Sequence, residues 1–393
     1  MRPGVRRGAL GLLLSGSLAI STGYGMLLLL PLYVVQLGGD EADFGLIMAT
    51  AAVPAALAIG WLVRYPDRIR PHLLLTASIA GYGVSAVAVA ASGSLLLLAA
   101  LGLLLGTAWA VVYTTTAMVV GRIVPDERRV VAFGYATGSQ QLGIGLGPVL
   151  AAALHGGGGG ASLPTVFVLG AALAAVGALA VATLTAFLPR GELERDAVEQ
   201  QSLGRALRSI MRSAAAMPLL LVLLSACLFT TLTFFQTTYA AAQHLNSDVF
   251  YLSYTVAVIA ARFGFSRLLV DVDPSRVAAW STTLLSAAVA SFLLVGSNPV
   301  IYAVASAATG VGYGLALPLL QAQAVALSAP DVRSRVLPLA GLLFETAILA
   351  FPALAGAVIS GLGYQAVFAV LLAFAVVQTA ITWRLPSHAP TAA

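Results

Sequence analysis

The sequence has very few charged residues, no lysine and a single cysteine. Charged side chains make up 9% of the 393 residues, whereas a soluble domain carries about 25%, and the mean hydropathy is +0.96. A soluble fold could not bury this much apolar surface, so we expect an all-α protein that spans a lipid bilayer. The one cysteine, Cys227, excludes an intrachain disulfide and a cysteine-rich metal site.

Apolar runs long enough to span a membrane recur along the whole chain. A helix needs about 20 such residues to cross the hydrocarbon core of about 30 Å. The runs predict twelve membrane helices, at residues 8–36, 44–63, 72–92, 94–120, 130–154, 164–188, 216–241, 249–269, 275–296, 299–327, 336–358 and 364–384. The first run continues to about Val35, which is too long for the apolar core of a signal peptide, so we interpret it as the first membrane helix.

The arginines lie almost entirely on one side of this arrangement. Twelve alternating helices place nineteen of the twenty on the same side, and the remaining one, Arg262, lies within a helix. Positive residues concentrate on the cytoplasmic side of membrane proteins. The asymmetry therefore predicts that both termini are cytoplasmic, which requires an even number of helices. Because the arginines are scattered between apolar spans and form no single basic face, we expect no nucleic-acid partner despite the net charge of +5.

The chain divides into two similar halves. The longest polar segment, residues 190–215, separates six expected helices in 1–189 from six in 216–393, and we expect it to be a cytoplasmic linker. Three features recur at a nearly constant offset: Pro125-Asp126 and Pro330-Asp331 (205 residues apart), Trp109 and Tyr313 (204), and Pro148 and Pro352 (204). A fixed offset indicates an internal repeat. Two parallel six-helix repeats are typical of transporters with a substrate site between their halves.

The fifth expected helix carries a motif of glycines and one proline. Its residues Gly134, Gly143, Gly147 and Pro148 have the spacing of the antiporter signature in helix 5 of drug and metabolite exporters, with alanines in place of the two final glycines. The chain therefore resembles the drug/metabolite:proton antiporter branch of the major facilitator superfamily (MFS). The resemblance implies the twelve-helix MFS fold, a cavity lined by helices 1, 4, 7 and 10, and a transporter that is not an enzyme.

The loop after the second expected helix partly matches another signature of the same family. Its glycine, its helix-end aspartate and its basic residues correspond to Gly60, Asp67, Arg68 and Arg70. The match is degraded, because Arg64 stands near the position where the family has an aspartate. We therefore do not assign this loop the gating contact that the signature forms in the family.

Small residues follow two opposite faces of the fifth expected helix. At 100° per residue, Gly143 and Gly147 share one face with Ser139, and Gly134 and Gln141 share the other. Small residues four apart let helix backbones approach closely in lipid. The resemblance implies that this helix packs against helix 8 at a seam that opens and closes, and we expect Gly143 and Gly147 at that seam. Tight packing without a role in transport is the alternative.

Glu345 is the only acidic residue inside an expected span. A charge at the bilayer centre costs about 2.5–3.5 kcal/mol on insertion scales. Pro338, Gly341, Pro352 and Gly356 share its helix face, so this face meets protein or a cavity. A carboxyl group that exchanges a proton as water access alternates could couple transport to the proton gradient. The alternative is a structural ion pair or a hydrogen-bonded helix contact.

Candidate substrate-binding residues are polar or aromatic side chains on the helices that the resemblance assigns to the cavity. They are Tyr24, Trp109, Tyr113, Gln141, Gln236, Tyr239, Arg262 and Tyr313. Arg262 either extends toward the cytoplasmic surface, pairs with Glu345 or contacts an anionic substrate. A mostly apolar cavity with aromatic walls suits an amphipathic or weakly polar small molecule.

The sequence as a whole predicts proton-coupled efflux of a small organic molecule by a monomer in the cytoplasmic membrane of a bacterium. The expected partners are the substrate, protons and the lipid bilayer. No nucleotide-binding motif is evident, so uphill transport would use an ion gradient, and we expect no cofactor and no metal. An uptake symporter or facilitator on the same fold, and a membrane protein that moves lipids or senses ligands, are the alternatives.

Overall fold

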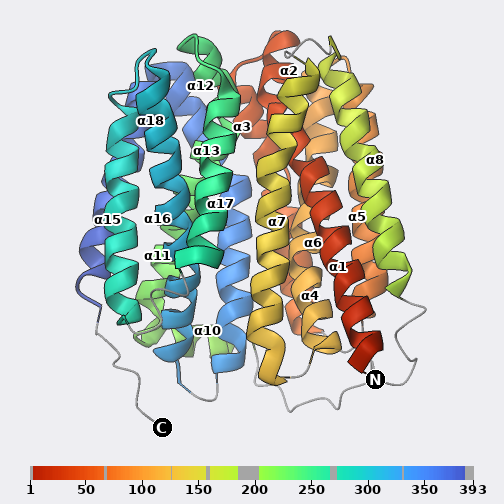
Figure 1. Ribbon diagram of the computed structural model, residues 1–393, viewed down its shortest axis with the longest axis vertical. Coiled ribbons are helices and arrows are strands. Elements are labelled where there is room, and N and C mark those ends of the chain that lie inside the picture. The colour runs from red at the N-terminus through yellow and green to blue at the C-terminus, as the bar shows by residue number, and fades with distance from the viewer. Residues whose placement is uncertain are drawn as a thin grey trace. The chain divides into compact units, whose positions relative to one another are not determined.

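The computed structural model describes residues 3–65, 69–124, 126–155, 160–184, 203–265, 272–329 and 332–385. Every regular element in these ranges is a helix (Figure 1). The chain divides into two compact units: unit 1 is Met1–Gly39 with Leu46–Gln200, and unit 2 is Asp40–Gly45 with Gln201–Ala393. The expected linker falls partly outside the described residues, and its described part contains the helix α10 (Leu203–Arg212).

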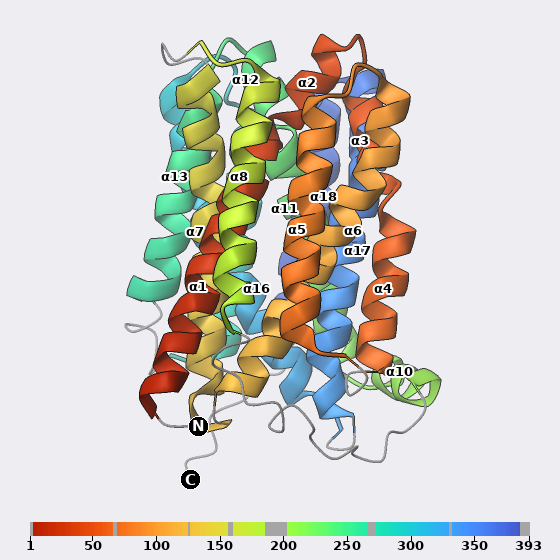
Figure 2. The same cartoon turned by 90° about the vertical axis from the view of Figure 1, so that its right-hand side faces the viewer.

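Unit 1 is a bundle of long helices. Its elements are α1 (Pro3–Met26), η1 (Leu27–Leu29), α2 (Leu30–Gln36), the end of α3 (Glu41–Ala49) from Leu46 on, α4 (Ala52–Arg64), α5 (Pro71–Ala90), α6 (Leu95–Ile123), α7 (Asp126–His155) and α8 (Leu163–Ala182). α1 packs along α7 and α8, while α5 packs along α6 and α8 (Figure 2). This packing places α1 and α7 side by side, which matters for the glycines of α7.

Unit 2 is a second bundle. After α10 come α11 (Ala216–Phe234), α12 (Gln236–Ala242), α13 (Ser247–Ile259), the π-helical turn η3 (Ala260–Phe265), α15 (Pro274–Phe292), α16 (Pro299–Ala326), α17 (Arg333–Leu362) and α18 (Tyr364–Thr382). α15 packs along α16 and α18, α13 along α16, and α11 along α17. The first turn of α3 also belongs to this unit, because the Tyr364 hydroxyl donates to Glu41 at 2.7 Å.

Proline explains two of the interruptions in the long helices. A proline ring collides with the carbonyl group four residues earlier and removes one N–H donor. Pro31 stands four residues after Leu27, where α1 gives way to the 3₁₀ turn η1. Pro54 stands four residues after Thr50, and α3 ends at the residue before that threonine. The single span expected at 44–63 is therefore built from two helices, α3 and α4.

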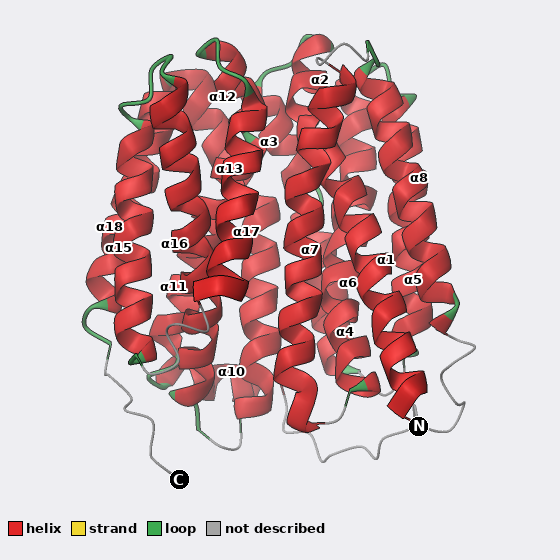
Figure 3. Ribbon diagram, viewed as in Figure 1, coloured by secondary structure: helices red, strands yellow, loops and turns green. Residues whose placement is uncertain are grey.

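Nine of the described helical segments are long and apolar enough to cross a membrane. They are Gly8–Gln36, Glu41–Leu62, Pro71–Ala90, Leu95–Ile123, Leu163–Ala182, Ala216–Phe234, Pro299–Ala326, Arg335–Leu362 and Tyr364–Thr382. Each coincides with an expected span. The other three expected spans correspond to α7, to α13 with η3, and to α15, which are also helical (Figure 3). The count of twelve spans and the cytoplasmic position of the termini stay predictions.

Candidate substrate and coupling site

Glu345 lies in the middle of α17, seven residues from a proline on each side. Its side chain is 1% exposed. The Oε2 atom has no hydrogen-bond partner among the described residues, and no charged group in that part of the chain acts on the carboxyl. An ion pair with Arg262, which the sequence left open, is therefore not formed. A buried carboxyl oxygen without a hydrogen-bond partner is costly when the group is ionised.

The second of these prolines frees a backbone acceptor at the contact between α17 and α11. Pro352 has no N–H group, so the carbonyl of Ile348, four residues earlier, loses its helical donor. The Thr230 hydroxyl of α11 donates to this carbonyl at 2.9 Å. The proline thus gives α17 an acceptor that α11 satisfies, which fixes the depth of Glu345 relative to α11.

Unit 1 contains an equivalent contact. Pro148 in α7 frees the carbonyl of Ile144 in the same way. This carbonyl faces Gly25 of α1, where an added Cβ atom would lie 2.6 Å from the oxygen. The residues of the two contacts differ by 204 positions in α7 and α17 and by 205 in α1 and α11. The close agreement with the offsets found in the sequence supports an internal repeat.

Unit 2 contains an aromatic stack that reaches α17, the helix that carries Glu345. The rings of Phe229 and Tyr313 are stacked, with centroids 4.7 Å apart and an interplanar angle of 14°. The ring of Phe229 also contacts that of Phe344, the residue before Glu345 in α17, with centroids 6.2 Å apart. The stack therefore joins α11, α16 and α17.

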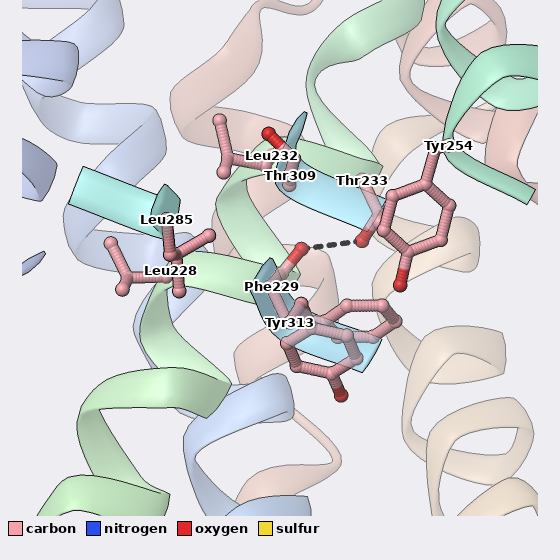
Figure 4. Close-up of a pocket in the computed structure, with 8 residues that line it drawn as sticks. All are labelled: Leu228, Phe229, Leu232, Thr233, Tyr254, Leu285, Thr309 and Tyr313. Carbon is pink, nitrogen blue, oxygen red and sulfur yellow. Dashed lines mark hydrogen bonds between the residues drawn. The ribbon is translucent and has the colours of Figure 1, made fainter. Parts of the chain in front are cut away.

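A small pocket lies against this stack. It is lined by Leu228, Phe229, Leu232, Thr233, Tyr254, Leu285, Thr309 and Tyr313 (Figure 4). The hydroxyl groups of Tyr254 and Tyr313 point the same way in this view. The Tyr254 hydroxyl is buried and has no hydrogen-bond partner within the described ranges. The pocket is too narrow to hold a water molecule, so a ligand would enter only if its walls moved apart.

Unit 1 builds a matching stack from α1 and α6. Tyr24 and Trp109 are stacked with centroids 3.8 Å apart and an interplanar angle of 18°, and Tyr82 lies 6.2 Å and 6.3 Å from them. The two members of this stack precede Phe229 and Tyr313 by 205 and 204 residues. Each unit therefore carries one stacked aromatic pair at the same place in the repeat.

The repeat also relates Gln141 in α7 to Glu345 in α17. The two positions are 204 residues apart, three residues before the freed carbonyl in each helix. The Oε1 atom of Gln141 is buried and lacks a hydrogen-bond partner among the residues described, as the Oε2 atom of Glu345 does. The two units thus share the shape of this position but not its charge: unit 1 has a neutral amide where unit 2 has an acid.

Two further candidate residues, Gln236 and Tyr239, belong to a second aromatic group in unit 2. The Tyr302 hydroxyl donates to the Gln236 side chain at 2.8 Å, and the ring of Tyr239 lies 6.1 Å from that of Tyr302. Phe250 connects this group to the Phe229–Tyr313 stack, because it contacts both Tyr302 and Tyr254. The structure therefore brings Gln236, Tyr239 and Tyr313 into one continuous cluster.

Arg262 lies in the π-helical turn η3 and is half-buried. Its charge is close enough to act on the Tyr254 hydroxyl. π-Helical turns occur frequently at functional sites. Tyr113 is half-buried one turn after Trp109 in α6. Both residues remain candidates for substrate contact.

Gly143 and Gly147 do not lie where the sequence placed them. Both pack against α1 of the same unit: a Cβ atom on Gly143 would lie 2.7 Å from the Cβ of Ser21, and one on Gly147 would lie 2.5 Å from the Cα of Gly25. The prediction that they form a seam with the other half is therefore wrong. Helical periodicity identifies the residues that share a face but not the helix they meet. Gly134, on the opposite face, is exposed with open space around it.

The partial signature between the second and third expected helices is only partly visible. Asp67 and Arg68 lie outside the described residues. Gly60 lies within α4, and Arg70 is exposed at the N-cap of α5. The gating role that the family gives this loop therefore receives no support here.

A comparison with protein families agrees with this architecture. The family model described as "Major Facilitator Superfamily" matches residues 12–272, which is more than half of the chain. The chain belongs to the Major Facilitator Superfamily. As a member of this superfamily it is a multi-pass membrane protein and a secondary transporter of small molecules, not an enzyme.

Solved structures of other MFS proteins are similar over almost the whole chain. The human organic anion transporter MFSD10 (TETRAN) has 17% identity and a TM-score of 0.71, covering 97% of this chain and 100% of its own. The nucleoside transporter NupG has 15% identity and a TM-score of 0.76, covering 96% and 99%. A bacterial homolog of the human lysosomal transporter Spinster, inward-facing and unoccupied, has 13% identity and a TM-score of 0.72, covering 98% and 97%. Such low identities show a shared fold alone. No curated protein sequence matches significantly.

Sequence reasoning missed several members of the MFS protein's aromatic cluster. Phe229 and Tyr254 are aromatic residues in apolar helices and look like ordinary core residues. A signal for Phe229 was nevertheless present, because it stands 205 residues after Tyr24, as Tyr313 stands 204 after Trp109. No comparable signal marks Tyr254.

Proposed function

We propose that this MFS protein exports a small organic molecule across the cytoplasmic membrane by alternating access, in exchange for protons that bind Glu345. The observation that carries the proposal is the state of Glu345, which is buried, has an unpartnered carboxyl oxygen and has no charged neighbour among the described residues. A purely structural glutamate would need an ionic or hydrogen-bonding partner to offset the cost of burial. A carboxyl group that gains and loses a proton needs none in its neutral form.

The aromatic clusters support an organic substrate with an apolar body. Each unit offers a stacked pair at the same place in the repeat, and unit 2 adds the unpartnered hydroxyl of Tyr254. Buried aromatic rings with a few polar groups are typical of sites for drug-sized molecules. Two of the similar structures are named as transporters of organic anions and of nucleosides. We therefore propose that the substrate is an organic solute that inserts a flat apolar group among these rings.

The free energy released when one proton crosses the membrane down its gradient is large enough for this function. Moving one charge across 100 mV is worth about 2.3 kcal/mol, and one pH unit is worth about 1.4 kcal/mol per proton. Either amount corresponds to at least tenfold accumulation of the substrate. One titratable group is therefore sufficient for uphill transport.

The test uses the full-length protein in proteoliposomes with a substrate found by screening toxic compounds in an efflux-deficient host. Glu345→Gln mimics the protonated form at nearly unchanged volume. It should abolish accumulation driven by a pH gradient and keep exchange of labelled for unlabelled substrate, which needs no net proton release. Asp273→Asn is the matched control, because it removes an acid outside the spans while an asparagine still caps α15. That control should transport as the wild type does.

Two results would contradict the proposal. If the Glu345→Gln variant concentrates substrate with wild-type pH dependence, Glu345 is structural and coupling occurs elsewhere. If substrate accumulates together with protons moving in the same direction, the protein is an uptake symporter. The sign of the response to an imposed pH gradient separates these cases.

A further inference from the structure

The helix α10 has two chemically different faces. At 100° per residue, its arginines at positions 205, 208 and 212 fall within about 60° of one another. The positions 203, 206, 207 and 210, which hold leucine, alanine, leucine and isoleucine, fall on the opposite side. Arg208 and Arg212 are exposed, whereas Ile210 is 1% exposed. At the positions whose exposure the structure describes, the helix therefore presents arginines to its surroundings and turns an apolar residue inward.

α10 lies immediately before a candidate membrane span. Only Ser213–Ala215 separate it from α11, which begins one of the candidate spans. Three residues reach at most about 10 Å, and they form a tight turn in which the Ser213 N–H donates to the Ile210 carbonyl at 3.0 Å. Figure 2 shows α10 turned across the direction of the long helices. In the first turn of α11, Met217 is 51% exposed, as a lipid-facing residue would be.

We propose that α10 is an interfacial helix whose arginines bind the phosphate groups of anionic phospholipids. Exposed arginines a few residues from a membrane span attract such lipids through their charge. Arginine also forms paired hydrogen bonds with phosphate oxygens. The exposed side chain of Met211, at 56%, lies between the cationic and apolar faces by its register and would enter the acyl region. This lipid contact is independent of the direction and coupling of transport.

The experiment measures which lipid collects next to α10 in the full-length protein. Ser209 is exposed on the cationic side, so Ser209→Cys in a Cys227→Ala background places a single fluorophore there. The protein is reconstituted in phosphatidylcholine vesicles that contain either phosphatidylglycerol or phosphatidylcholine with a nitroxide near the headgroup end of the acyl chain. At low salt, half-maximal quenching should need at least about fivefold less of the phosphatidylglycerol probe, since one arginine near an anionic surface contributes about a factor of five.

Variants decide whether α10 causes this preference. Replacing all three of its arginines by glutamine should abolish the preference, and replacing them by lysine should largely keep it, because lysine has the same charge. The triple variant of Arg276, Arg333 and Arg384 to glutamine removes equal charge elsewhere in unit 2 and should leave the preference intact. A fluorophore at Ser297, in the exposed loop before α16, should show none.

Equal quenching by the two lipids in the wild type, or an unchanged preference in the glutamine variant of α10, would overturn the proposal. If that variant fails to insert into the membrane, the proposal is tested instead by measuring the lipid preference of the protein with its α10 arginines intact at increasing salt concentration. Screening shortens the range of charge interactions from about 10 Å at 0.1 M to about 3 Å at 1 M. The preference should then shrink strongly in 1 M salt, and a preference that persists there contradicts an electrostatic contact.

Discussion

Replacing Gly147 by alanine should destabilise unit 1 although alanine is the better helix former. The added Cβ atom would lie 2.5 Å from the Cα of Gly25 and would also collide with the carbonyl oxygen of Thr22. Both neighbours are backbone atoms of α1, so no side chain can rotate away. Since ordinary contacts begin at 3.4 Å, the two helices would have to separate by about 0.9 Å at this level. A Cβ atom on Gly25 would in turn lie 3.0 Å from the Cδ of Pro148, so there is little space on either side of this contact.

The loss of unfolding free energy caused by Gly147→Ala can be estimated from the same contact. Overpacking by one methyl group in a well-packed interior costs about 1–3 kcal/mol. The higher helix propensity of alanine returns at most about 1 kcal/mol. Gly134→Ala is the matched control, because it makes the same change in the same helix at an exposed position with nothing within 4 Å. The propensity gain is common to both variants, so their difference in unfolding free energy reports the clash alone, about 1–3 kcal/mol.

The measurement is the midpoint of thermal unfolding of the purified protein in detergent, followed by loss of the monodisperse peak in size-exclusion chromatography. Membrane proteins of this size often unfold irreversibly, so both variants need the same heating rate. Each kcal/mol shifts the midpoint by about 2–4 °C in a unit of 150–250 residues, so Gly147→Ala should unfold several degrees below Gly134→Ala. Equal midpoints would show that α1 and α7 do not touch at Gly147.

Three further predictions concern unit 1, unit 2 and the topology. Gly143→Leu should reduce the amount of folded protein, because it forces α7 away from α1, and normal yield and stability would contradict this contact. Tyr302→Phe should lower the unfolding free energy by about 1–3 kcal/mol, since it leaves the buried Gln236 oxygen without its donor. Tyr254→Phe is the control: it removes a hydroxyl group that makes no hydrogen bond within the described residues, and it should unfold like the wild type. A cysteine in loop 155–163 should react with an impermeant maleimide from outside the cell and a cysteine in 203–215 only from inside; labelling of both from outside would refute the twelve-helix topology.

The sequence predicts the positions of the long helices well because the bilayer imposes one simple requirement on each of them. A run of apolar residues long enough to cross the hydrocarbon core has to be helical, so the composition of the run is sufficient. Interruptions inside a run depend on finer chemistry. Two residues before the break at Phe235, which separates α11 from α12, the Thr233 carbonyl accepts a hydrogen bond from the Tyr251 hydroxyl at 2.7 Å. Apolar length carries no trace of such a break.

The site is predictable to a different degree. Glu345 stands out in the sequence because an acid within a span is costly, and the structure finds it buried. The partner of a glycine face, in contrast, depends on how helices are arranged in three dimensions, and so Gly143 and Gly147 were assigned to the wrong neighbour. The aromatic cluster around Phe229 was also hidden, because packing and binding use the same residue types. What separates them is the repeat, which relates Phe229 to Tyr24.

The relation between Gln141 and Glu345 has an evolutionary consequence. Glutamine and glutamate codons differ by one base at the first position, so a single point mutation converts either residue into the other. If the two halves descend from one duplicated gene, the ancestral dimer of identical halves held two equal groups at this place, and one such mutation was enough to make them unequal. Moving the acid from unit 2 to unit 1 would take two such mutations, Glu345→Gln and Gln141→Glu. The assignment of the ionisable group to one half is therefore a trait that distant members of this fold could have acquired in either half, with little rearrangement of the rest of the protein.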